Sequence, residues 1–68
     1  MELSKLIAVL WSPSQKAFHK EPLCEYVARN ELEATGQSNP TDYKVIFIAY
    51  TDLFANVYID KMTPILRP

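Results

Sequence analysis

The chain has 68 residues, 49% of them hydrophobic and only one a glycine, which is the composition of one packed globular domain with no room for a second core. Seven lysines and arginines against eight aspartates and glutamates give a formal net charge of −1, so partners selected by bulk charge, such as nucleic acid, are not expected. One cysteine and one histidine exclude an internal disulfide, and they cannot build a four-ligand zinc site without carboxylates or a second subunit.

The first predicted strand runs from Leu3 to Trp11, because its apolar residues are continuous and then stop abruptly. A helix of this length is the alternative, but the stop and the valine and tryptophan content favour a strand. The stop is a turn over Ser12 to Gln15, in which Pro13 supplies a fixed φ angle. A short second strand follows from Lys16 to Lys20, and its lysines on either side of Phe18 suit the edge of a sheet.

A helix is predicted to begin at Pro22, since proline is well tolerated at the first helical position. It is predicted to end near Gly36, which lies where a helix C-cap favours glycine. At helical spacing, one side of this segment is mainly apolar and the opposite side is charged. The first side holds Leu23, Tyr26, Val27, Asn30 and Ala34, and the second holds Glu25, Arg29 and Glu33. Leu32 is out of phase and is predicted to point toward the polar side.

The densest run of β-branched and aromatic residues lies between Tyr43 and Tyr50, which predicts a strand. Its apolar residues from Val45 to Ala49 are consecutive and do not alternate with polar ones. A strand with one face in water would alternate, so we expect this strand to lie inside the sheet with both faces covered.

Thr51 and Asp52 offer N-cap chemistry directly after that strand. The segment from Leu53 to Met62 is predicted to be a helix that stops at Thr63 and Pro64, with a strand as the alternative. The expected fold class is therefore α+β, a small mainly antiparallel sheet with helices in the order ββαβα. If the last segment is extended, the order becomes ββαββ. One domain is expected over residues 1–68.

Few residues have the chemistry of an active site. Cys24 lies in the first turn of the predicted helix and His19 lies just before it, but Glu21 and Glu25 flank the cysteine and oppose thiolate formation. The carboxylates form no convincing pair, and a single glycine excludes glycine-rich phosphate loops. We therefore expect a non-enzymatic protein without a metal or cofactor.

The aromatic residues are spread over every predicted element, and we expect most of them to belong to the core. An RNA-binding sheet would couple such rings to a basic surround, which this chain lacks, so a nucleic-acid-binding module is the alternative function. The preferred function is protein interaction, because two helices on one face of the sheet would leave an apolar face uncovered. The candidate interface residues are Val45, Ile46, Phe47, Ile48, Trp11 and Leu32.

A signal peptide is not expected, because the apolar run from Leu6 to Trp11 is short and the start lacks a basic region. That run is also too short for a membrane span. We expect a cytoplasmic protein with a reduced thiol, of a size that suits a small regulatory or accessory protein. Domains of this size bury only about 60% of their unfolded surface, so we expect a homo-oligomer, for example a homodimer, or a protein partner.

Overall fold

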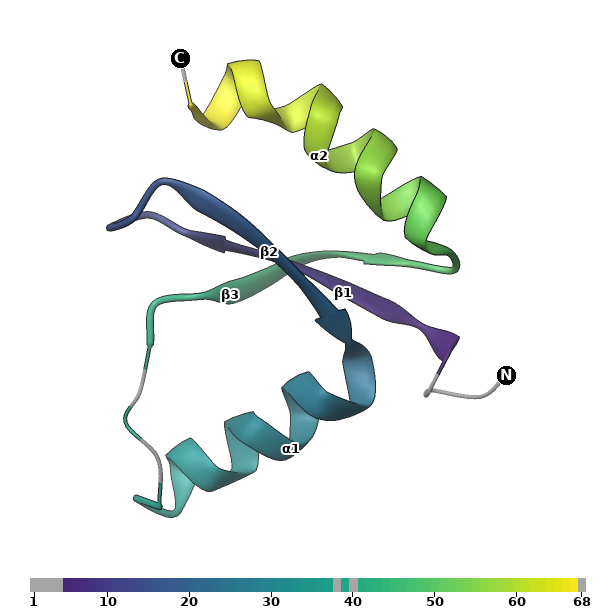
Figure 1. The fold of residues 1–68 in the computed structure, drawn as a ribbon. Coiled ribbons are helices and arrows are strands. Elements are labelled where there is room, and N and C mark those ends of the chain that lie inside the picture. Colours follow the sequence, from purple (N-terminus) through teal and green to yellow (C-terminus); the bar gives the residue numbers. More distant parts are fainter. Residues whose placement is uncertain (1–4, 38, 40, 68) are drawn as a thin grey trace.

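A computed structural model of the chain describes residues 5–37, 39 and 41–67. Its five elements follow the predicted ββαβα order and form a small α+β fold (Figure 1). The predicted fold class is confirmed, and the segment after Thr51 is helical, not extended. The elements are β1 (Ile7–Ser12), β2 (Ala17–Pro22), α1 (Leu23–Ala34), β3 (Lys44–Ala49) and α2 (Asp52–Leu66). The predicted start of the first strand at Leu3 lies outside the described residues.

The sheet has three antiparallel strands in the order β2-β1-β3, so β1 is the interior strand. The prediction that Tyr43 to Tyr50 would be interior is wrong, because β3 lies at an edge. Ala8, Val9 and Leu10 of β1 are fully buried. A continuous apolar run is typical of an interior strand, but in three strands only one can be interior. The edge position predicted for the second strand is confirmed.

The pairing of β1 with β3 contains a bulge. Val9 lies opposite Phe47 and Leu10 lies opposite Val45, so Ile46 has no partner on β1. A bulge of this kind bends the strand and increases its twist. The register is regular again from Phe47 to Ala49.

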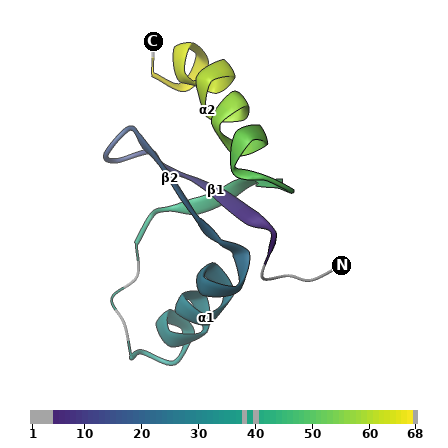
Figure 2. The same cartoon turned by 45° about the vertical axis from the view of Figure 1, so that its right-hand side comes forward.

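The two helices cover opposite faces of the sheet (Figures 1 and 2). Ala55 of α2 packs with Val9 and Ala49 in the core, and Lys20 on β2 donates hydrogen bonds to Asp52 and Asn56 of α2 at 2.8 and 2.7 Å. The expectation that both helices would lie on one face is therefore wrong. Because β1 is apolar on both faces, a helix on each face removes both from water.

An ion pair attaches α1 to the other face of the sheet. Glu21 of β2 lies opposite Ala8, and its carboxylate accepts a hydrogen bond of 3.0 Å from Nη1 of Arg29 and a second contact from Nη2. Glu33 lies 3.9 Å from Arg29 Nε. The faces predicted for this helix are thus offset, because Arg29 turns toward the sheet while Val27 remains exposed.

The predicted helix ends lie close to those in the structure, apart from the last one. Pro22 was predicted as the first helical residue, but it ends β2 and is the N-cap of α1, which begins at Leu23. Thr51 caps α2 by accepting a hydrogen bond of 3.2 Å from the Phe54 N–H. Gly36 follows α1 with a φ of 78°, which is the left-handed conformation of a C-cap glycine. The helix α2 continues past the predicted stop to Leu66. Pro64 is on the exposed side, so water can bind the carbonyl group left without its helical partner.

Asp42 fastens the turn between β1 and β2 to the chain that leads into β3. Its carboxylate accepts hydrogen bonds from the Ser12 hydroxyl at 2.5 Å and from the Ser14 N–H at 2.8 Å. The Ser12 oxygen also accepts from the Gln15 N–H at 3.2 Å. The hydrogen bonds from Ser12 and Ser14 favour the charged carboxylate and lower the pKa of Asp42 to about 2.

The molecule is thin in one direction, with extents of 35 × 32 × 10 Å. Its radius of gyration is 12.5 Å, whereas a compact domain of this length has about 11 Å. The accessible surface is 4790 Å², against about 4400 Å² for a compact monomer of this mass. Neither helix in the described ranges has the length and hydropathy to cross a membrane. The single chain therefore leaves more surface in contact with water than a compact monomer does.

Asp42 should make the stability of the fold depend on pH in the acidic range. Because its pKa is lower in the folded chain than the unfolded value of 3.8, its stabilising contribution is present above about pH 4 and lost as the pH falls toward 2. In Asp42→Asn this part of the pH dependence should disappear, measured as urea midpoints across that range. Asp60→Asn, on the exposed side of α2, is the matched control and should retain it; equal profiles for the two variants would contradict the assignment.

Arg29 should hold α1 on the sheet. Arg29→Ala leaves the Glu21 carboxylate, whose side chain is only 9% exposed, without its cation. We expect the free energy of unfolding to fall by about 1–3 kcal/mol, with hydrogen exchange increasing first in α1. Glu25→Ala removes an exposed charge from the same helix and should change stability little. Because alanine is the best helix former, a loss as large in Glu25→Ala would contradict the assignment of the effect to the ion pair.

Candidate interaction surface

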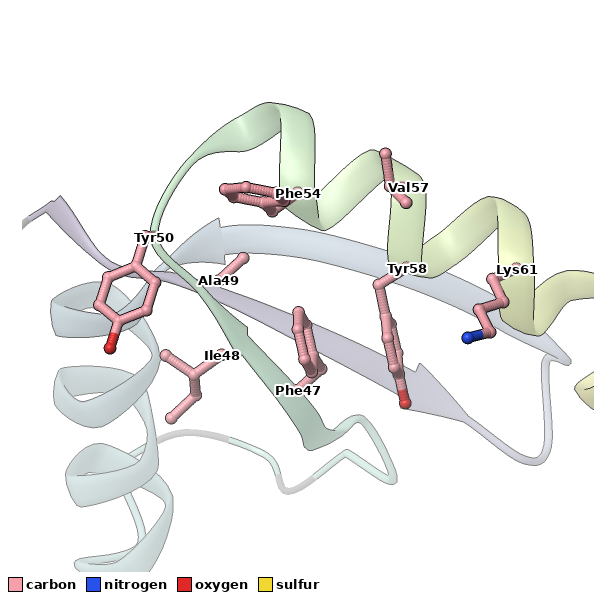
Figure 3. Close-up of a pocket in the computed structure, with 8 residues that line it drawn as sticks. All are labelled: Phe47, Ile48, Ala49, Tyr50, Phe54, Val57, Tyr58 and Lys61. Carbon is pink, nitrogen blue, oxygen red and sulfur yellow. The ribbon is translucent and has the colours of Figure 1, made fainter.

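An open apolar groove of about 550 Å³ lies between the edge strand β3 and α2 (Figure 3). We call it the β3–α2 groove. Its lining is almost entirely apolar, and among the residues that the structure describes Lys61 is the one charged residue that contributes to it. The lining residues are Phe47, Ile48, Ala49, Tyr50, Phe54, Val57, Tyr58 and Lys61.

The groove follows from the short connection between β3 and α2. Only Tyr50 and Thr51 separate the two elements, so α2 begins beside the end of the strand that it packs against. Phe47 and Tyr58 stack with ring centroids 4.2 Å apart and planes at 3°, which fixes the helix against the strand. Figure 3 shows these two rings side by side, with Phe54 above them on α2.

Most of the lining side chains are exposed although they are apolar. Tyr50 is 65% exposed, Phe54 57%, Val57 54% and Ile48 46%. The helix turns Ala55 to the sheet, and this leaves Phe54 and Val57 on a neighbouring stripe that no element of the described chain covers. Exposed apolar surface of this kind, gathered in one place, marks interaction sites.

The outer edge of β3 borders the groove. A strand at the edge of a sheet presents unpaired backbone N–H and C=O groups that another strand can bind. On the side away from α2, Ile48 and Tyr50 project outward beside this edge (Figure 3). The groove therefore offers both apolar side chains and backbone hydrogen-bonding groups.

The sequence candidates for an interface fall in three places. Val45, Ile46, Phe47 and Ile48 are on the edge strand, and the last three are exposed. Trp11 is half-buried in β1, where its ring packs on that of Phe18 at 4.7 Å. Leu32 is exposed on α1, outside the groove.

Of the residues that line the groove, only Phe47 and Ile48 were interface candidates from the sequence. The most exposed of the residues that were missed are Tyr50, Phe54 and Val57. The sequence feature that could have identified them is the apolar side of α2, which is wider than a helix needs to cover one sheet face. Two neighbouring apolar stripes on one helix indicate two surfaces to bury.

The residues with catalytic chemistry are dispersed in the described part of the chain. Cys24 is exposed, and the ring of His19 lies edge-on against Tyr43 at 5.9 Å. No group of three histidine, cysteine or acidic side chains capable of holding a metal is found in residues 5–37, 39 and 41–67. The lowered pKa of Asp42 is explained by its hydrogen bonds to the turn.

Comparison of the chain with protein-family models, with curated proteins and with solved structures gives no significant match.

Proposed function

We propose that this chain is a small non-enzymatic protein-interaction domain that docks on a protein through the β3–α2 groove. The observation that carries the proposal is the exposed apolar lining of the groove beside an open strand edge. A protein partner can satisfy both features together, because it supplies apolar side chains and backbone hydrogen-bonding groups. The class of function agrees with the sequence expectation of an adaptor, an inhibitor or a self-associating domain.

The composition of the groove supports a protein partner over a small charged ligand. Aromatic side chains are the anchors of protein interfaces, and Tyr50, Phe54 and Tyr58 are three of them in one groove. With Lys61 as the only charge among the described lining residues, long-range electrostatic steering contributes little. Recognition rests on shape and apolar burial.

Nucleic-acid binding, the alternative function, gains little support from the rings. Phe47 stacks on Tyr58, Trp11 packs on Phe18, and His19 packs on Tyr43. These contacts inside the chain reduce the ring surface on which bases could stack. The exposed rings that remain lack the basic surround that follows a phosphate backbone.

Site-specific photocrosslinking in the cells that make this protein tests the proposed surface. With p-benzoyl-phenylalanine in place of Phe54, we expect covalent adducts of higher mass, whether the partner is another protein or a second copy. The same group in place of Val27, which is also exposed but lies on α1, is the control. Adding Val57→Lys should remove the adducts. Similar adducts from both positions, or none from Phe54, would contradict the proposal.

Affinity for nucleic acid should stay in the non-specific range. We expect dissociation constants no tighter than about 10⁻⁴–10⁻⁶ M for mixed-sequence single strands at physiological salt, measured by fluorescence anisotropy. A submicromolar value that weakens steeply with added salt would make the alternative function the better one.

A further inference from the structure

We propose that the partner of the β3–α2 groove is a second copy of this chain. The two β3 strands pair antiparallel about a twofold axis, which joins two three-stranded sheets into one of six strands. This inference rests on the proposed function and names its partner. Four features of the molecule carry it: its thinness, the contrast between its two sheet edges, the charge pattern of β3 and the area available.

The thin direction of the molecule is the direction in which a sheet grows. Its smallest extent of 10 Å matches two strand spacings of about 4.8 Å, and each sheet face carries one helix. A second copy added at β3 would double this dimension and give a sheet with two helices on each face. That arrangement is the usual three-layer packing of helices on both sides of a sheet.

The two edges of the sheet differ in how they discourage pairing. The β2 edge carries Lys20, Glu21 and Pro22, which are the charges and proline that protect natural edges. The β3 edge has Lys44 at its start and then only apolar residues. The bulge at Ile46 twists this edge but leaves Phe47 to Ala49 regular. Pairing is therefore directed to β3.

The charge pattern of β3 suits an antiparallel copy of itself. Lys44 is the only charged residue of the strand and lies at one end. In an antiparallel pair centred on the middle of the strand, Lys44 falls opposite an apolar residue near the other end. In a parallel pair the two lysines would lie side by side and repel. Among the described residues, the groove of each copy has a single charged lining residue, Lys61. A second copy can therefore bind through apolar contacts without supplying an acidic group.

The exposed apolar area approaches that of a stable dimer. A large side chain presents on the order of 200 Å² when fully exposed. The residues at 37–65% exposure on β3 and the neighbouring stripe of α2 therefore offer on the order of 600 Å² per copy, against about 800 Å² in a standard interface. The residues counted in this area are Ile46, Phe47, Ile48, Tyr50, Phe54 and Val57.

Light scattering and filtered NMR on the purified full chain test the pairing. We expect a mass of twice 7.8 kDa at high micromolar concentration. In a mixture of ¹³C-labelled and unlabelled chains, intermolecular contacts between the Hα atoms of β3 residues would establish the antiparallel pairing. These measurements need no variant, so they do not depend on whether a substituted chain folds.

Ile48→Lys places a charge beside the paired edge and should weaken the dimer by on the order of 100-fold. Val27→Lys is the matched control, since Val27 is 45% exposed against 46% for Ile48 and lies on α1. It should leave the dimer intact. Far-UV circular dichroism of both variants checks that they are folded.

Two outcomes overturn the pairing. One is a wild-type chain that stays at 7.8 kDa; the other is a dimer whose intermolecular contacts lie outside β3. In either case adducts from position 54 to a different protein would leave the proposed function standing. Absence of both dimer and adducts would refute the two proposals together.

Discussion

A three-stranded sheet has room for only one strand with hydrogen-bonded neighbours on both sides, and in this chain that strand is β1. Its central residues, Ala8, Val9 and Leu10, are fully buried. Everything else is arranged to cover it: a strand on each edge and a helix on each face. Because a domain of this size has little buried surface to lose, any change that uncovers β1 affects the whole fold.

The helices are attached to this sheet in different ways. Ala55 of α2 joins the apolar core with Val9, and Lys20 also binds the first turn of the helix. The helix α1 contributes no fully buried residue and is held by the ion pair of Arg29 with Glu21. A short chain has few large side chains to distribute over two faces, so polar contacts complete the attachment on the side where apolar cover is thin.

The same shortage explains the β3–α2 groove. One helix on a sheet face covers β1 but cannot also cover the outer edge of β3. Ile48 and Tyr50 at this edge therefore remain exposed. The exposed stripe of α2 that holds Phe54 and Val57 borders the same edge. A partner in the groove, as proposed, would stabilise the fold, because it would bury surface that a single copy leaves in water.

The sequence alone determined the first four elements and their order, because these depend on local chemistry, and it favoured a helix over a strand for the segment after Thr51. The stop at Pro13, the cap at Thr51 and the glycine at Gly36 act within a few residues of themselves. Only the tertiary structure decided which apolar strand is interior, since both runs read alike and the choice depends on which strand finds two neighbours. It also decided the inward face of α1, where Arg29 turns to a carboxylate on β2. Such pairings join residues distant in sequence, so periodicity cannot reveal them.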